Sequence, residues 1–88
     1  MKTLLQPGDK IKIRNDIKQA TWYKMKTSET KNTYISANMA KPGQIVTIKK
    51  ISGRGEYFIE EDRLCCYTDE MFEPDLIEYL YEEYLNNK

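Results

Sequence analysis

The residue types that carry most enzyme chemistry are scarce in this chain. It has no histidine, and its two cysteines, Cys65 and Cys66, are adjacent. Without histidine, the chain lacks the side chain that most often transfers protons near neutral pH. A disulfide between neighbours would be strained, and a zinc site requires four ligands at spaced positions. We therefore expect reduced cysteines in a strand, no metal, no cofactor and no catalysis; a redox role of the vicinal pair is the alternative.

Charged side chains, in contrast, are abundant and are sorted along the chain. Residues 1–50 carry eleven lysines and arginines against three acids, whereas residues 51–88 carry eleven acids against three bases. The formal net charge of zero therefore conceals two halves of opposite sign. Such asymmetry is what electrostatic recognition of a charged partner requires, although the two halves could also neutralise each other within one fold.

The acidic half ends in a predicted amphipathic helix. Pro74 suits a first helical turn, and a period of 3.6 residues places the acids on one side and the apolar residues on the other. Seven acids lie between Asp69 and Glu83 with no base among them, so no ion pair within the helix offsets their repulsion. Tyr79 lies on the acidic side, where an aromatic residue can anchor a partner. The leading candidate for a partner-binding surface consists of Asp75, Glu78, Tyr79, Glu82 and Glu83.

An acidic surface of this kind suits a protein partner with a basic surface, and it could also imitate the phosphate backbone of a nucleic acid. The alternative is that the acids face water or face the basic strand of the same chain. The apolar side of the helix is expected to pack on the body of the fold, or else on a second copy in a weak homodimer. This apolar stripe consists of Leu76, Ile77, Leu80, Tyr81, Tyr84 and Leu85.

The basic half offers a second candidate surface, for nucleic acid. The alternation in Lys10–Arg14 predicts a strand that buries Ile11 and Ile13 and projects its bases from the opposite face. Lysines beside Trp22 and Tyr23 suit phosphate contacts combined with base stacking. The alternative is a solvated strand face, with both aromatic residues folded back over the core. The residues of this second candidate are Lys10, Lys12, Arg14, Trp22, Lys24 and Lys26.

The elements that must position these surfaces are predicted to be mainly β. Pro7-Gly8, Pro42-Gly43 and Gly53–Gly55 mark turns between runs of β-branched residues. Residues 15–43 lack periodicity and are predicted to form a long loop with a short strand near 33–35. Short strands with Gly-rich turns are typical of an antiparallel meander that closes into a small barrel. The strands are expected at 10–14, 44–51, 56–60 and 63–67, in a single domain with a barrel at about 7–73 and a helix at about 74–86. The TDEMF segment before the helix is expected to be a tight turn that places Met71 and Phe72 in the core.

A series of short motifs resembles a pattern found in small uncharacterised proteins of phages and prophages of Gram-positive bacteria. The pattern covers about residues 7–73, and its most specific part is the TDEMFE string. The Trp expected before Thr68 is Tyr67 here, and the helix after Pro74 extends beyond the pattern. The resemblance implies an SH3-like barrel but no agreed activity. The matching segments are Pro7–Arg14, Met39-Ala40, Gly43 with Thr47-Ile48, Tyr57 with Ile59, and Thr68–Glu73.

Together these features predict a non-enzymatic protein-binding module. No apolar run approaches the roughly 18 residues that a membrane helix needs, and Leu4–Leu5 is too short for a signal-peptide core, so we expect a cytoplasmic protein with no membrane partner. The leading function is a phage or prophage inhibitor of a host nucleic-acid-processing or defence protein, including an anti-CRISPR role. The alternatives are a nucleic-acid-binding SH3-like domain that uses the basic half, and a structural or assembly protein that associates head to tail.

Overall fold

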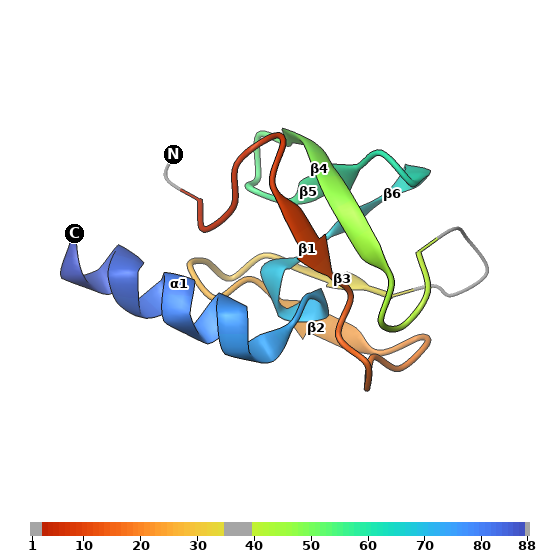
Figure 1. Cartoon of the computed structure of the whole chain (residues 1–88), viewed down its shortest axis with the longest axis horizontal. Coiled ribbons are helices and arrows are strands. Elements are labelled where there is room, and N and C mark those ends of the chain that lie inside the picture. Colours follow the sequence, from red (N-terminus) through yellow and green to blue (C-terminus); the bar gives the residue numbers. More distant parts are fainter. Residues whose placement is uncertain (1–2, 35–39, 88) are drawn as a thin grey trace.

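The computed structural model describes residues 3–34 and 40–87, except for the side chains of residues 63 and 64. Within these ranges the fold is mainly β, with a C-terminal helix, as the sequence predicts (Figure 1). Ile35, at the end of one predicted strand, and Met39, in one matched motif, lie outside the described residues. The elements are β1 (Lys10–Lys12), β2 (Trp22–Lys24), β3 (Lys31–Thr33), β4 (Ile45–Ile51), β5 (Tyr57–Ile59), β6 (Asp62–Tyr67), the 3₁₀ turn η1 (Asp69–Met71) and α1 (Pro74–Asn86).

A four-stranded antiparallel sheet forms the body of the fold, in the order β1-β4-β5-β6. In β1, Ile11 is paired with Val46 of β4, and both side chains are buried. Because side chains alternate along a strand, this register turns Lys10 and Lys12 to the other face. A turn with Gly43 at a φ of 79° precedes β4, and this left-handed conformation explains why glycine stands there.

The long segment between β1 and β4 is largely irregular among its described residues, as its composition predicts, but it also contains a hairpin that was not predicted. β2 and β3 form an antiparallel hairpin, with Tyr23 opposite Asn32, and the N–H of Met25 donates to the carbonyl of Thr30 at 2.8 Å across the turn. Met25 and Tyr34 are buried, and Tyr23 packs against the core. These apolar contacts with the body therefore hold strands that are individually too short to show a period of two.

β1 also pairs on its second edge, with the segment that follows η1. Ile13 forms an antiparallel bridge with Phe72, and the N–H of Glu73 donates to the carbonyl of Lys12 at 2.8 Å. The expected closed barrel is not seen, however. Among the described residues the strands form two separate sheets, because the hairpin joins the body through side chains rather than through a backbone ladder.

The core lies between the body of the fold, the hairpin, η1 and α1. Ile13, Tyr57 and Phe72 are fully buried, and the Tyr57 and Phe72 rings meet edge to face at 5.9 Å between centroids. Met71 is also fully buried. The prediction that the TDEMF segment is a tight turn that buries Met71 and Phe72 is therefore confirmed.

The helix α1 spans the residues that the periodicity predicts, but its apolar stripe is covered only in part. Ile77 is buried, and Leu80, Tyr81 and Tyr84 are half-buried. Leu76 and Leu85 are 37% and 46% exposed, so the expectation that they pack on the body is wrong. In Figure 1 the C-terminal end of α1 extends past the end of the sheet, along the longest dimension of the molecule. No helix in the described ranges has the length and apolar content needed to cross a membrane.

Candidate functional site

The outward face of α1 carries all five residues predicted to bind a partner. Their side chains are exposed, and that of Tyr79 is 59% exposed. Among the described residues, one of these acids forms an ion pair: Glu78, with the Lys26 ammonium at 3.1 Å. The alternative in which the acids face the chain's own basic half therefore applies to Glu78. The structure brings the five residues together as one face, namely Asp75, Glu78, Tyr79, Glu82 and Glu83.

The composition of this face opposes helix stability. Glu82 lies four residues after Glu78, so the two like charges repel each other. Glu82 and Glu83 also lie near the negative end of the helix dipole, and the last turn contains no base. Each unfavourable placement typically costs about 0.3–1 kcal/mol. Glu82 and Glu83 therefore do not contribute to holding α1 together, and a role outside the fold explains their presence better.

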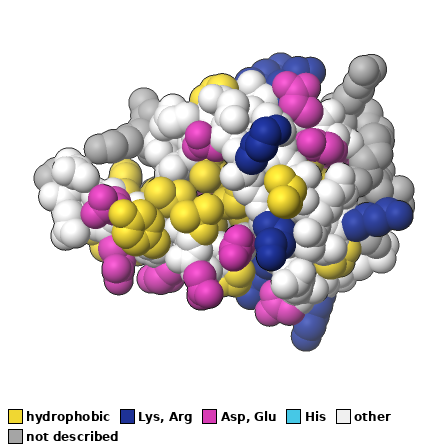
Figure 2. All heavy atoms as spheres, viewed as in Figure 1, with side chains coloured by type: hydrophobic (Ala, Val, Ile, Leu, Met, Phe, Trp, Pro, Cys, Tyr) yellow, Lys and Arg dark blue, Asp and Glu magenta, His cyan; other side chains and the backbone are white. Residues whose placement is uncertain are grey.

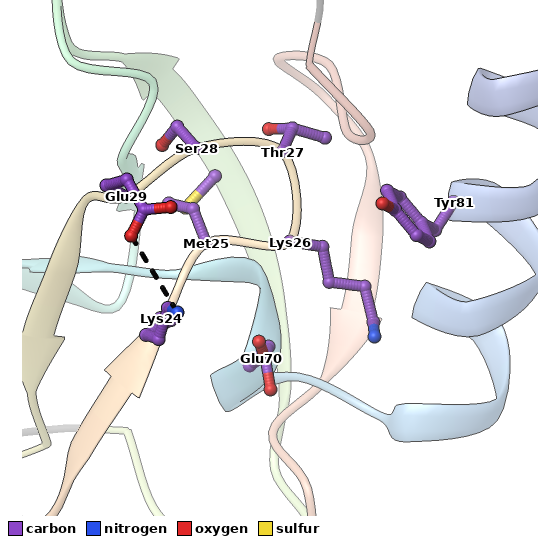
Figure 3. A pocket seen from close by; sticks show the side chains of 8 residues that line it. All are labelled: Lys24, Met25, Lys26, Thr27, Ser28, Glu29, Glu70 and Tyr81. Carbon is purple, nitrogen blue, oxygen red and sulfur yellow. Dashed lines mark ion pairs between the residues drawn. The ribbon is translucent and has the colours of Figure 1, made fainter.

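A junction between the β2–β3 hairpin and α1 fixes the position of the helix. The backbone N–H of Lys26 donates to Asp69 Oδ1 at 3.0 Å. The side-chain ammonium of Lys26 lies 5.3 Å from the centroid of the Tyr81 ring. The hydrogen bond to Glu78 raises the pKa of the Lys26 ammonium, so the cation persists through the neutral range. Figure 3 shows the Lys26 side chain extending from the hairpin turn toward Tyr81.

A hollow of about 420 Å³ lies at this junction, between residues 24–29, Glu70 and Tyr81 (Figure 3). Its two lysines face two carboxylates, and Lys24 forms a loose ion pair with Glu29 at 3.9 Å. Because the charges of the lining balance, the hollow provides no excess charge with which to hold an anion or a cation.

Most bases of the predicted nucleic-acid surface already form contacts within the protein. Arg14 Nε donates to Asp16 at 2.7 Å, Arg14 Nη1 donates to the carbonyl of Glu70 at 3.0 Å, and the guanidinium lies over the Tyr23 ring. The hydrogen bond between the two side chains raises the pKa of Arg14 and lowers that of Asp16. Lys24 and Lys26 also have acidic partners, so three of the predicted bases are already paired. Lys10 donates to the Thr47 hydroxyl at 3.0 Å, and Lys12 is half-buried.

Trp22 is the aromatic member of the predicted nucleic-acid set. Its side chain is 61% exposed, and the Lys31 ammonium lies 5.4 Å from the ring centroid. The alternative in which both aromatic residues fold back over the core is thus true of Tyr23 and wrong for Trp22. The two side chains point to opposite faces of β2 because they are neighbours on a strand.

The cysteines lie in β6, as predicted, and both are half-buried thiols. Burial raises the pKa of the Cys66 thiol, which opposes formation of the reactive thiolate. Neighbouring side chains in a strand point to opposite faces, so the two sulfur atoms do not converge on one ligand. Within residues 3–34 and 40–87, no three histidine, cysteine or acidic side chains form a cluster that could hold a metal ion.

Two fully buried carboxylates were not singled out by sequence reasoning. Asp62 accepts the Tyr67 hydroxyl at 2.8 Å, and burial, together with this contact, raises the pKa of Tyr67. Asp69 is fully buried, and burial raises its pKa to about 6. The only sequence signal for Asp69 was its position in the TDEM turn, which does not reveal burial of its carboxylate.

A shallow groove beside α1 was also missed. It has a volume of about 160 Å³ and lies between the N-terminal segment and the C-terminal half of the helix, lined by Thr3, Leu4, Leu80, Glu83, Tyr84 and Asn87. Its side chains come from the two ends of the described chain, so no local pattern could reveal it.

Comparisons with known protein families, with curated protein sequences and with solved structures gave no match to this chain. Its function must therefore be inferred from the geometry and chemistry of its own residues.

Proposed function

We propose that this chain is a non-enzymatic protein-binding module that acts in the cytoplasm of a bacterial host as a phage- or prophage-encoded inhibitor. Its target is a nucleic-acid-processing or defence protein, such as a nuclease or an RNA-guided effector, whose basic surface binds α1. The acidic face occupies the groove that normally holds a phosphate backbone. The motifs at Pro7–Arg14 and Thr68–Glu73 support the phage origin.

The observation that carries this proposal is the state of α1. Its acids are exposed, and all but Glu78 lack an ion-pair partner among the described residues. An exposed Tyr79 stands among them. Aromatic residues are enriched at binding hot spots, and a fixed array of carboxylates both attracts a basic surface and orients it.

We also propose that the body is an SH3-like arrangement, open on one side. The order β1-β4-β5-β6 supports this, as does the return of the chain after η1 to pair Phe72 with Ile13. A closed or nearly closed barrel requires such a pairing between its first strand and its last segment. The hairpin β2–β3 is then an insertion between the first two strands of the barrel.

The test is inhibition of purified targets. A panel of nucleases and RNA-guided endonucleases from Gram-positive bacteria is assayed for DNA cleavage and for displacement of labelled DNA in the presence of the protein. We expect stoichiometric inhibition of at least one enzyme. The double variant Glu82→Lys/Glu83→Lys should bind that enzyme at least about 100-fold more weakly, since each reversal costs about 1.4 kcal/mol or more at a charged interface.

The matched control is Glu29→Lys/Glu60→Lys, which makes the same change in net charge at two exposed acids outside α1. It should inhibit like the unmodified protein. Equal loss in both double variants would mean that net charge alone governs binding, and absence of inhibition across the panel would contradict the inhibitor function.

Trp22 favours a second candidate function, nucleic-acid binding. The exposed indole and Lys24 lie on the same face of β2, with Lys31 over the ring, and this combination suits an unpaired base and its phosphate. Fluorescence anisotropy of labelled single- and double-stranded DNA and RNA tests this function at low and physiological salt. Tight binding that falls with salt and is lost in Trp22→Ala would establish it; the inhibitor proposal expects no binding.

A further inference from the structure

The side of α1 that faces the N-terminal segment combines an apolar ridge with an acidic border. Leu76, Leu80 and Tyr84 recur every four residues and therefore form one ridge along the helix. Leu76 is 37% exposed, and Leu80 and Tyr84 line the groove against Thr3 and Leu4. In Figure 2, hydrophobic side chains gather along this face of α1, and acidic side chains border them.

The charges around the ridge have one sign. Glu83 belongs to the lining of the groove, which contains no lysine or arginine among the described residues. Asp75 and Glu82 are also exposed, but the helical rotation of about 100° per residue places them on nearly the opposite side of α1, so Glu83 is the acid that borders the ridge. A partner that fits this surface must therefore present apolar side chains flanked by lysine or arginine.

The backbone around the groove favours a helical partner over an extended one. The main-chain groups in the middle of α1 are hydrogen-bonded within the helix, and the N–H of Leu5 donates to the Tyr57 hydroxyl at 3.3 Å. An added strand would find no row of unpaired backbone groups along this helix, whereas a helical partner satisfies its own backbone. The spacing of the ridge also matches the grooves between rows of side chains on a second helix.

We propose that the ridge of Leu76, Leu80 and Tyr84, together with the groove that its C-terminal part lines, is the docking site for a basic amphipathic helix of the partner protein. This inference rests on the proposed function and specifies the part of the partner that α1 recognises. A second copy of this chain does not fit, because an α1 of another molecule would place acids against acids. The apolar ridge provides the anchor, and Glu83 orients a basic flank of the bound helix.

The test uses a labelled 18-residue helical peptide with leucines on one face and lysines on the others. Anisotropy should show saturable binding to the full chain at physiological salt. Leu76→Gln and Glu83→Gln should each weaken binding by about fivefold or more, because each removes a contact on the bound face. The matched control is Leu85→Gln, which alters an exposed leucine on the other flank of α1 and should leave the affinity unchanged.

Two further measurements keep the result interpretable. A peptide of the same composition, scrambled so that it has no apolar face, should bind at least about fivefold more weakly. Amide resonances of Leu4, Leu76 and Leu80 should shift in an NMR titration with the amphipathic peptide, whereas those of β4 should not.

Several outcomes would overturn the inference. If Leu76→Gln and Leu85→Gln weaken peptide binding equally, the peptide does not bind specifically at the ridge. If the scrambled peptide binds as tightly as the amphipathic one, charge alone accounts for binding. Sedimentation of the protein without peptide tests for a dimer. If a dimer is found and Leu76→Gln dissociates it, the ridge is an interface between two copies of this chain.

The same variant separates this inference from the proposed function. Inhibition that is lost in Glu82→Lys/Glu83→Lys but retained in Leu76→Gln would leave the inhibitor function intact and overturn the docking site. Peptide binding that depends on Leu76, together with no inhibition of any enzyme in the panel, would support the docking site and contradict the inhibitor function.

Discussion

At the scale of single residues, Asp69 is the most constrained ionisable group. It is fully buried, and while Oδ1 accepts the Lys26 N–H, Oδ2 has no hydrogen-bond partner among the described residues. A buried carboxylate that is only partly hydrogen-bonded favours its neutral form, and the pKa of Asp69 is accordingly about 6 against an ordinary 3.8. The residue links η1 to the hairpin, so its charge affects the stability of the whole fold.

Replacing Asp69 by asparagine should stabilise the protein above pH 6. The folded state binds the proton more tightly than the unfolded state, so the free energy of unfolding falls as pH rises from about 4 to 6. A shift of this size corresponds to about 3 kcal/mol. The variant Asp69→Asn keeps an oxygen acceptor for the Lys26 N–H but has no charge, so it avoids this loss.

Urea unfolding at several pH values between 4 and 8 measures this effect. The difference between the variant and the unmodified protein should be smallest near pH 4 and should grow in favour of the variant up to about pH 7. Taking the difference removes the contributions of the other carboxylates. A difference that does not change with pH would show that Asp69 is ionised at an ordinary pKa.

At the scale of elements, the hairpin and α1 depend on each other through Lys26. Its ammonium contacts both Glu78 and the Tyr81 ring, whereas its backbone holds Asp69. Lys24 is a natural comparison, since its ion pair with the exposed Glu29 is looser, at 3.9 Å. Substituting each lysine in turn therefore compares the stability contributed by a contact at the junction with that contributed by a contact on the surface.

Replacing Lys26 by Met should destabilise the fold by about 0.5–1 kcal/mol, because a partly exposed ion pair and a cation–π contact are lost. The methionine keeps the aliphatic contact with Tyr81. Thermal unfolding at low salt measures the loss, which should shrink at about 1 M salt as the pair is screened. Lys24→Met should change stability by less than about 0.3 kcal/mol, and equal effects of the two variants would contradict the junction.

A second prediction at this scale separates stability from binding. Glu82→Lys places a base near the C-terminus of α1 and four residues after Glu78, so it should stabilise the protein by about 0.3–0.8 kcal/mol. Thermal unfolding checks the gain, and the inhibition assay should show weaker binding by the same variant. Reduced stability would mean that Glu82 makes a favourable contact within the fold, against its exposure.

At the scale of the whole molecule, the charge sorting of the sequence becomes a separation in space. Exposed acids lie on α1, whereas the exposed Lys10, Lys49 and Lys50 lie on β1 and β4. A head-to-tail assembly, in which the acidic face of one molecule meets these lysines of another, is the third hypothesis.

This separation predicts unusual behaviour on ion exchangers. At pH 7 and low salt, the protein should bind to both anion and cation exchangers despite its net charge of zero. Lys49→Gln/Lys50→Gln should elute earlier from the cation exchanger. Sedimentation at low salt should show a monomer, and self-association that disappears at high salt would instead favour the head-to-tail assembly.

Much of this protein was determined by its sequence alone. The period of two in Lys10–Arg14, the β-branched run that becomes β4, and the period of 3.6 after Pro74 identified the elements, because side-chain periodicity is a local property. The TDEMF segment likewise identified the turn that buries Met71 and Phe72. The acidic face of α1 was also predictable, since it depends only on spacing within one helix.

Tertiary structure decided the rest. The hairpin β2–β3 exists because Tyr23, Met25 and Tyr34 reach the core, and contacts of that kind have no local signature. The separation into two sheets, the burial of Asp69 and the pairing of Glu78 with Lys26 likewise depend on residues far apart in the chain. The exposure of Leu76 was decided in the same way: a helix pattern shows which side chains share a face, but only the position of the body determines how much of that face is covered.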